Sequence, residues 1–239
     1  MGSITNNLQE VKRRIQAACL TAGRSADSAV LLAVSKTMPA AAVQEAHAAG
    51  QTQFGENYVQ EALDKINALA ALRGRLVWHL IGPLQSNKTR PVTQAFDWVH
   101  TVDRLKMAQR LAEQRPANLP PLNLCLQVNV SGEASKSGVA PAEVLALAQA
   151  VARLPPHQVR LRGLMSIPEP ASTEAAQRAP HRVLRELLHS LRAADPLLAG
   201  LDTLSMGMSA DLEAAVAEGS TLVRVGSAVF GPRAAPLDR

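Results

Sequence analysis

Aromatic residues are scarce in this sequence and make up only 3% of its 239 residues. Few side chains are therefore available to stack on the bases of a single-stranded nucleic acid. The formal charge of +5 would suit a nucleic-acid partner, but the 25 lysines and arginines are spread along the chain and form no basic run. We therefore expect no nucleic-acid partner, and an anionic small ligand is the better use of local positive charge.

Cysteine and long apolar runs are also lacking. Cys19 and Cys125 are the only two cysteines, and their separation matches no metal-ligand or redox motif, so we expect buried, reduced thiols and no metal site. No apolar run approaches the roughly 20 residues that a membrane-spanning helix needs. Residues 1–14 are polar and charged, unlike a signal peptide. The sequence thus predicts a cytoplasmic protein with no membrane partner.

The chain does contain a regular alternation of short apolar runs and helical patterns. Its length and its 47% hydrophobic content fit one domain, residues 1–239, with a sizeable core. Helical spacing within residues 1–22, followed by Gly23, predicts an amphipathic N-terminal helix. The expected strands are residues 30–36, 51–54, 76–81, 98–102, 122–130, 159–167, 201–206 and 221–225. Asp103 is expected to cap a helix over residues 104–114.

Eight such units predict an α/β fold, a (β/α)8 TIM barrel over residues 30–231. A doubly wound open sheet is the alternative topology. In a barrel, the carboxyl ends of all eight strands meet at one mouth, where the chemistry of such proteins is placed. The expected mouth residues are Lys36, Asn57, His79, Asn129, Met165, Ser166, Met206 and Arg224.

Lys36 is the most informative of these residues, because it ends an apolar run that reads as a buried strand. Two interpretations stay open. In one, a lysine held beside apolar surface supplies the free amine that attacks an aldehyde and gives a Schiff base. In the other, it is a strand-end lysine that reaches into solvent.

Two segments with glycine and serine follow the seventh and eighth strands, where barrel enzymes often bind phosphate. Residues 205–211 contain Gly207 and Ser209, and residues 225–228 contain Gly226 and Ser227. Glycine lets the backbone approach a phosphate, and the serine hydroxyls can donate to it. Ordinary serine-capped turns are the alternative. An anion site facing a reactive lysine fits pyridoxal 5′-phosphate, and a sugar phosphate is not excluded.

Seven stretches of the sequence resemble the pyridoxal phosphate homeostasis protein family, single-domain relatives of the alanine racemase barrel, the fold-type III barrel of pyridoxal phosphate proteins. They are AVSKT at 33–37, FGENYVQE at 54–61, WHLIGPLQSNK at 78–88, SKSG at 135–138, GLMS at 163–166, MGMSAD at 206–211 and VRVGSAVFG at 223–231. The resemblance covers nearly the whole chain. Met38 departs from it, because many members carry a second lysine there, so a role of that lysine in transferring the cofactor does not carry over.

The resemblance implies that Lys36 holds pyridoxal 5′-phosphate as a Schiff base. It implies that Ser209, Gly226 and Ser227 hold the phosphate and that Arg224 faces the pyridine nitrogen. A guanidinium group only donates hydrogen bonds and keeps its proton, so the ring nitrogen would stay unprotonated. Such a ring is a poorer sink for the electrons of a substrate carbanion.

The remaining candidates have two interpretations each. Asn57 supports the lysine or cofactor, or it caps a loop. Met165 and Met206 are expected to pack around the cofactor ring. His79 is a general base or a hydrogen-bonded histidine packed at a strand end. Lys136 attracts phosphate or is solvated.

The resemblance implies a homeostasis protein, not an enzyme, which binds pyridoxal 5′-phosphate and passes it to other proteins, such as the apo forms of enzymes that use it. The alternative is an amino-acid racemase, which needs an acid or base on each face of the cofactor. In alanine racemases the second group is a tyrosine from a carboxyl-terminal domain of the partner subunit. This sequence ends at Arg239, and its single tyrosine, Tyr58, has no evident reason to reach the opposite face. We therefore expect a carrier, and a monomer.

Overall fold

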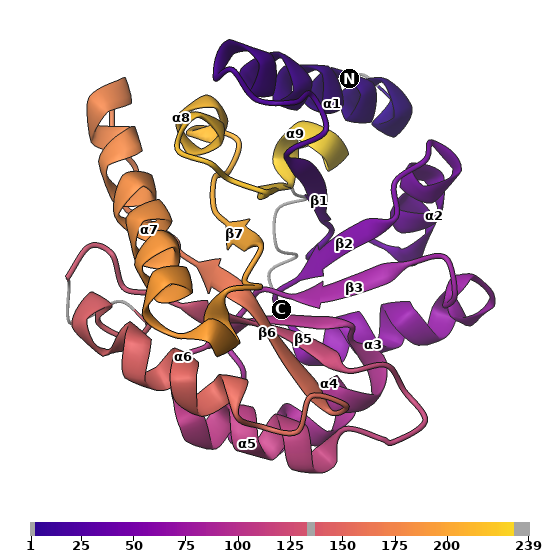
Figure 1. Ribbon diagram of the computed structural model, residues 1–239. Helices are drawn as coiled ribbons and strands as arrows, with labels where there is room; N and C mark the ends of the chain where they lie inside the picture. The colour runs from indigo at the N-terminus through magenta and orange to yellow at the C-terminus, as the bar shows by residue number, and fades with distance from the viewer. Residues whose placement is uncertain (1–2, 133–136, 232–239) are drawn as a thin grey trace.

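The computed structural model describes residues 3–132 and 137–231. Eight parallel strands close into one barrel in chain order, which confirms the predicted (β/α)8 fold and shows that the open-sheet alternative is wrong (Figure 1). The assignment of residues 1–239 to a single domain stays a prediction. The strands are β1 (Val30–Val34), β2 (Gln53–Glu56), β3 (Val77–Leu80), β4 (Trp98–Val102), β5 (Leu122–Gln127), β6 (Val159–Met165), β7 (Thr203–Ser205) and β8 (Leu222–Val225).

Helices surround the barrel (Figure 1). They are α2 (Ala40–Ala48), α3 (Val59–Ala68), α4 (Thr89–Ala95), α5 (Leu105–Gln114), α6 (Val144–Ala152), α7 (Glu174–Ala194), α8 (Leu212–Ala217) and α9 (Ser227–Phe230). Helices α2 to α8 connect successive strands, and α9 follows the last strand. Short 3₁₀ turns add η1 (Ala70–Leu72), η2 (Ser86–Lys88), η3 (Pro141–Glu143) and η4 (Pro196–Leu198). Among the described residues, no helix is both long enough and apolar enough to cross a bilayer.

The sequence pattern predicted some strand ends and one helix cap incorrectly. The strand predicted over residues 201–206 is only Thr203–Ser205. At its start, the Leu201 N–H bonds to the Leu198 carbonyl and belongs to the preceding turn, and after it Gly207 turns the chain with a φ of 91°. The cap predicted at Asp103 is also wrong, because its carboxylate accepts a hydrogen bond from the Arg104 side chain.

The barrel has an apolar outside and a partly polar inside. Side chains alternate along a strand, so neighbouring residues face opposite sides. On β7, Leu204 belongs to the hydrophobic core, whereas Ser205 bonds to Arg224 on β8 and to His100 on β4. This alternation places a chain of polar groups inside the barrel.

The predicted N-terminal helix is α1 (Ile4–Thr21), capped by the Ser3 side chain. Its buried face packs near β1, α8 and α9, at the seam where β1 pairs with β8 (Figure 1). Arg14 donates to the Ser209 carbonyl at 3.0 Å, and Asn7 donates to the Val229 carbonyl at 3.0 Å. The helix thus contacts the segments that follow both of the last two strands, the loop after β7 and α9 after β8.

Candidate functional site

Lys36 lies two residues beyond β1, at the carboxyl mouth of the barrel, and is partly buried. The β1–β8 pairing, with Ala33 opposite Val225, brings it beside the segment after β8. The two segments line one narrow cleft, formed by Val34, Lys36, Met38, Gly226, Ser227, Phe230 and Gly231. The fold therefore brings the predicted reactive lysine together with two of the three predicted phosphate-binding residues.

Gly226 and Ser227 form the start of α9, with Gly226 as its N-cap. The first N–H groups of a helix have no acceptor within that helix, so they are oriented to bind an external one. A Cβ atom on Gly226 would lie 3.2 Å from the Val34 carbonyl oxygen, so glycine permits the close approach of this turn to β1. The serine hydroxyl adds a donor at the exposed end of the cleft.

Ser209 lies in the loop between β7 and α8 and does not line the Lys36 cleft. The loop is held on its inner side, because Asp211 accepts from the Met208 N–H at 2.7 Å and contacts His181 Nε2 at 2.9 Å. Burial raises the pKa of Asp211, but these hydrogen bonds outweigh it, and its pKa lies below the ordinary value. The phosphate role of Ser209 stays a prediction.

Arg224 projects from β8 into the barrel and is buried. Its guanidinium donates to the Ser205 hydroxyl at 2.9 Å and to the Ser166 carbonyl at 2.7 Å. Burial lowers its pKa to about 10, so it remains protonated at neutral pH. It therefore supplies a fixed cation and only hydrogen-bond donors at the base of the mouth.

Two histidines extend this polar chain through the barrel. His100 Nδ1 lies 2.8 Å from the Ser205 hydroxyl, and His100 Nε2 lies 2.9 Å from His79 Nδ1. His79 also stacks on Trp98, with ring centroids 5.3 Å apart. Burial lowers the pKa of His79 to about 3, which makes it a weak base at neutral pH. Of its two interpretations, the packed, hydrogen-bonded histidine fits the structure.

Asn57 follows β2 on the next strand from Lys36 and lines a different cavity, of about 470 Å³, on the other side of the mouth. Within the part of the chain that the structure describes, its buried side-chain Oδ1 has no hydrogen-bond partner. Gly82 packs against it so closely that a Cβ atom there would lie 2.2 Å from the Asn57 carbonyl oxygen. Asn57 is thus held in place with one acceptor unused.

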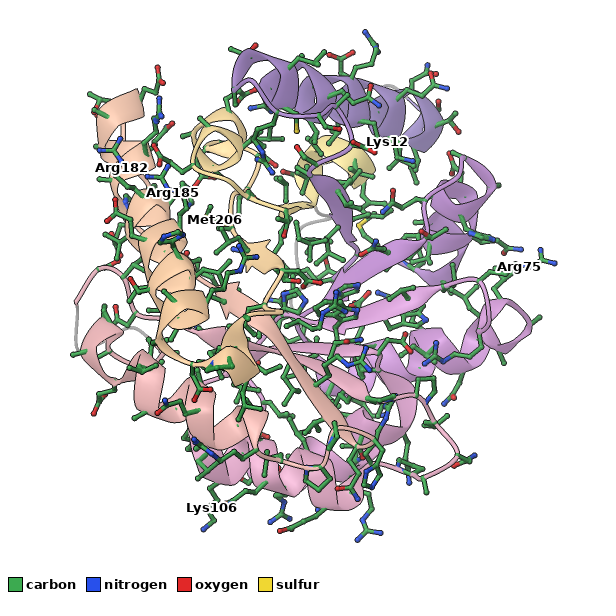
Figure 2. The ribbon with its side chains drawn as sticks, viewed as in Figure 1. Lys12, Arg75, Lys106, Arg182, Arg185 and Met206 are labelled. Atoms are coloured by element: carbon green, nitrogen blue, oxygen red, sulfur yellow. The ribbon has the colours of Figure 1, made fainter. Side chains whose placement is uncertain are left out.

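The other predicted residues have mixed placements. The Met206 side chain belongs to the hydrophobic core beneath the helices, so alternation along β7 turns it away from the barrel interior (Figure 2). Met165 is fully buried. Lys136 lies outside the described residues. Cys19 and Cys125 are free and buried, as predicted, and burial raises the pKa of Cys125 to about 12.

A buried ionic cluster that the sequence did not predict lies behind Lys36. Lys65 on α3 lies 2.6 Å from Glu56 at the end of β2 and 3.1 Å from Glu61. The four-residue spacing of Glu61 and Lys65 indicates an ion pair on one face of a helix. The contact of Lys65 with Glu56 depends on how α3 packs on the barrel, which the spacing does not reveal.

The basic side chains that Figure 2 labels come from different parts of the molecule and do not form one basic surface. Lys12 lies on α1, Lys106 on α5, Arg182 and Arg185 on α7, and Arg75 in the loop before β3. The predicted absence of a nucleic-acid partner stays a prediction. Among residues 3–132 and 137–231, no three histidine, cysteine or acidic side chains lie together as metal ligands would.

Comparisons with known proteins agree with this fold. Residues 2–234 match the family model described as "Alanine racemase, N-terminal domain". A Pseudomonas aeruginosa protein named pyridoxal phosphate homeostasis protein is 62% identical over 98% of this chain and 97% of its own length. An Escherichia coli K12 protein of the same name is 53% identical over 98% of each chain. PipY of Synechococcus elongatus, solved without pyridoxal phosphate, is 40% identical over 96% of this chain and all of its own, with a TM-score of 0.85. PipY has also been solved with pyridoxal phosphate bound, and that structure matches with a TM-score of 0.82.

Proposed function

The chain belongs to the pyridoxal phosphate homeostasis protein family, and from this membership we propose that it binds pyridoxal 5′-phosphate, holds it covalently on Lys36 and releases it to other proteins. The relatives are named for homeostasis and not for a catalysed reaction. The observation that carries the proposal is the shared cleft of Lys36, Gly226 and Ser227.

The donor set at the mouth fits this ligand. When bound, pyridoxal 5′-phosphate supplies an aldehyde to which a lysine amine can bond, a phosphate and a pyridine nitrogen. Lys36 offers the amine, the first turn of α9 offers N–H groups and a hydroxyl, and Arg224 offers a cation below them. We assign phosphate binding to Gly226, Ser227 and Ser209. We assign the contact with the ring nitrogen to Arg224, and support of the lysine or cofactor to Asn57. Met206 would contribute through packing behind β7.

Arg224 favours holding the cofactor over using it. Its pKa of about 10 keeps it protonated at neutral pH, so it donates a hydrogen bond to the ring nitrogen and retains its own proton. A ring without that proton withdraws electrons less, and the barrier for removing a proton from a bound amino acid stays high. The residues of this chain therefore bind and orient the ligand and give little help to turnover.

A racemase needs a second base, and the two candidates considered among the described residues do not suit that role. Tyr58, the single tyrosine, caps α3 and is 55% exposed, and the buried His79 is a weak base. We propose that the recipients are apo-enzymes, that the protein is a monomer and that it acts in the cytoplasm.

Absorbance and reduction test the attachment. The protein mixed with pyridoxal 5′-phosphate should show a visible imine band, and borohydride should convert it to a stable adduct on the peptide that contains Lys36. Lys36→Ala should abolish the adduct, whereas Lys106→Ala on α5 should leave it intact. An unchanged adduct in Lys36→Ala would refute the assignment.

Mixing tests the release. The loaded protein should restore activity to an apo-enzyme that needs pyridoxal 5′-phosphate, faster than the same protein after borohydride reduction. Alanine incubated with the loaded protein in D₂O should keep its α-proton. Rapid deuterium incorporation would favour the racemase instead.

A further inference from the structure

Three charged side chains lie buried or half-buried directly behind Lys36. The side chains of Lys65 and Glu56 are 3% and 0% exposed, and that of Glu61 is 32% exposed. Removing charges from water is costly, and a buried ion pair seldom repays that cost through stability alone. Burial raises the pKa of Glu56 and the nearby Lys65 ammonium opposes that shift. Because stability alone seldom explains such a cluster, we looked for a function in its contacts with the mouth of the barrel.

The hydrogen bonds of the cluster end on the backbone on both sides of Lys36. The Lys65 ammonium donates to the Ser35 carbonyl at 2.7 Å. The Glu61 carboxylate accepts from the Thr37 N–H at 2.6 Å. The two peptide groups that flank Lys36 are therefore each fixed by a charged side chain from α3.

Glu56 completes the arrangement from β2. Its Oε1 accepts from the Ser35 hydroxyl at 2.6 Å and from the Lys65 ammonium at 2.6 Å. Ser35 is thus held through both its carbonyl and its hydroxyl. Since hydrogen bonds to charged partners are about twice as strong as neutral ones, the start of the Lys36 turn is firmly located.

The turn needs this support, because Thr37 has a φ of 65°. It is the one residue other than glycine with positive φ in the described part of the chain. A left-handed conformation is unfavourable for a β-branched residue and persists only where the surroundings enforce it. The Glu61 bond to the Thr37 N–H supplies that enforcement, and relaxation of this turn would redirect the Lys36 side chain.

We propose that Glu56, Glu61 and Lys65 are positioning residues, which hold the Lys36 backbone in the orientation that lets its amine bond to an aldehyde. The inference rests on the proposed attachment of pyridoxal 5′-phosphate to Lys36. In that attachment the Lys36 nitrogen bonds to the aldehyde carbon, the carbon–oxygen double bond breaks, and the oxygen leaves as water with the two amine hydrogens. The cluster acts on this covalent step and leaves phosphate binding at α9 untouched.

Glu61→Ala tests the inference, because it leaves the buried pair of Lys65 and Glu56 intact. Two ligands are compared by titration: pyridoxal 5′-phosphate, and pyridoxine 5′-phosphate, which carries an alcohol in place of the aldehyde. We expect Glu61→Ala to raise the Kd for pyridoxal 5′-phosphate about tenfold, the effect of losing one charge-assisted bond. The Kd for pyridoxine 5′-phosphate should change less than about twofold. Glu61→Gln keeps an acceptor for the Thr37 N–H and should restore most of the difference.

Asp97→Ala is the matched control. Asp97 also accepts from a backbone N–H, that of Trp78 at 2.8 Å, and also pairs with a cation, Arg73. Its side chain is 27% exposed, similar to Glu61, but it lies before β4 at the opposite end of the barrel. It should alter the two Kd values equally, or not at all.

Equal losses for both ligands in Glu61→Ala would show a merely structural cluster and overturn the inference. Unchanged binding of both ligands would overturn it as well. In either case, a wild-type protein that still forms the borohydride-stable adduct on Lys36 would leave the proposed function standing. A wild-type protein without that adduct would overturn the attachment to Lys36 and the inference with it.

Discussion

His100 on β4 and Ser205 on β7 meet across the interior of the barrel, with His100 Nδ1 2.8 Å from Ser205 Oγ. Arg224 donates to the same Ser205 hydroxyl, because its guanidinium can only donate. The Ser205 hydroxyl is then used fully if it donates to His100 Nδ1, which leaves the proton of His100 on Nε2, facing His79 Nδ1. In this arrangement each donor from Arg224 through Ser205 and His100 meets one acceptor, ending at His79 Nδ1.

Ser205→Ala should break this chain. It removes an acceptor from Arg224 and a donor from His100 in a fully buried place, so the free energy of unfolding should fall by about 1–3 kcal/mol. Urea denaturation measures the change. Ser25→Ala, on the exposed loop after α1, serves as the control and should lie within about 0.5 kcal/mol of wild type. A Ser205→Ala protein of wild-type stability would show that this chain of hydrogen bonds does not stabilise the fold.

His79 should make stability depend on pH. Burial lowers its folded-state pKa from 6.5 to about 3, so the unfolded chain binds its proton at a higher pH than the folded protein. The contribution of neutral His79 to the free energy of unfolding is therefore complete above pH 6.5. It is lost as the pH falls from about 6.5 towards 3, at about 1.4 kcal/mol per pH unit. Urea titrations at pH 7.5, 6.5 and 5.5 should show a shallower loss for His79→Gln than for wild type. Parallel curves would rule out this source of the dependence.

Gly82→Ala should disturb the Asn57 side of the mouth. The new Cβ would lie 2.2 Å from the Asn57 carbonyl oxygen, so one backbone segment has to move. We expect a loss of about 1–3 kcal/mol in thermal unfolding experiments, as for overpacked positions. Gly74→Ala is the control, because a Cβ atom there would point into open space, and it should have little effect. Equal melting temperatures for the two variants would go against the close contact.

Ser209→Ala and Ser227→Ala should separate phosphate binding from ring binding. Each removes one hydroxyl from a segment assigned to the phosphate, and a hydrogen bond of about 1 kcal/mol corresponds to about fivefold in Kd. Titration should show weaker binding of pyridoxal 5′-phosphate and nearly unchanged binding of pyridoxal, which has no phosphate. A loss of the same size for both ligands would place the phosphate elsewhere.

Thr37→Gly should stabilise the fold. The left-handed φ costs a residue with a Cβ about 1–2 kcal/mol, and glycine avoids this but gains about 0.5–1 kcal/mol of unfolded-state entropy. The net gain in urea unfolding should be about 0.5–1 kcal/mol. Thr52→Gly, at an exposed position outside the strands and helices with ordinary φ, should instead lose stability. A loss of stability in both variants would mean that Thr37 carries no strain.

The sequence revealed the barrel because short, largely apolar runs such as Val30–Val34 alternate with segments of helical spacing along the chain. It also revealed Lys36, because a lysine directly after such a run stands out. It did not reveal the pairing of Lys65 with Glu56 or the contacts of Ser205 with His100 and Arg224, because these partners come from other elements and are set by packing. The orientation of Met206 was also not predictable, because the length and register of β7 decide which residues face the barrel interior. Leu201 belongs to the preceding turn despite its apolar side chain.

The seam between β1 and β8 has a consequence for synthesis. Ala33 pairs with Val225, so the first strand of the barrel cannot complete its pairing until the last strand has been synthesised. On a ribosome, Lys36 emerges early, but the cleft that it shares with Gly226 and Ser227 cannot exist until β8 has left the exit tunnel. An incomplete chain therefore has no formed site, and the ability to capture a ligand there distinguishes finished molecules from nascent ones.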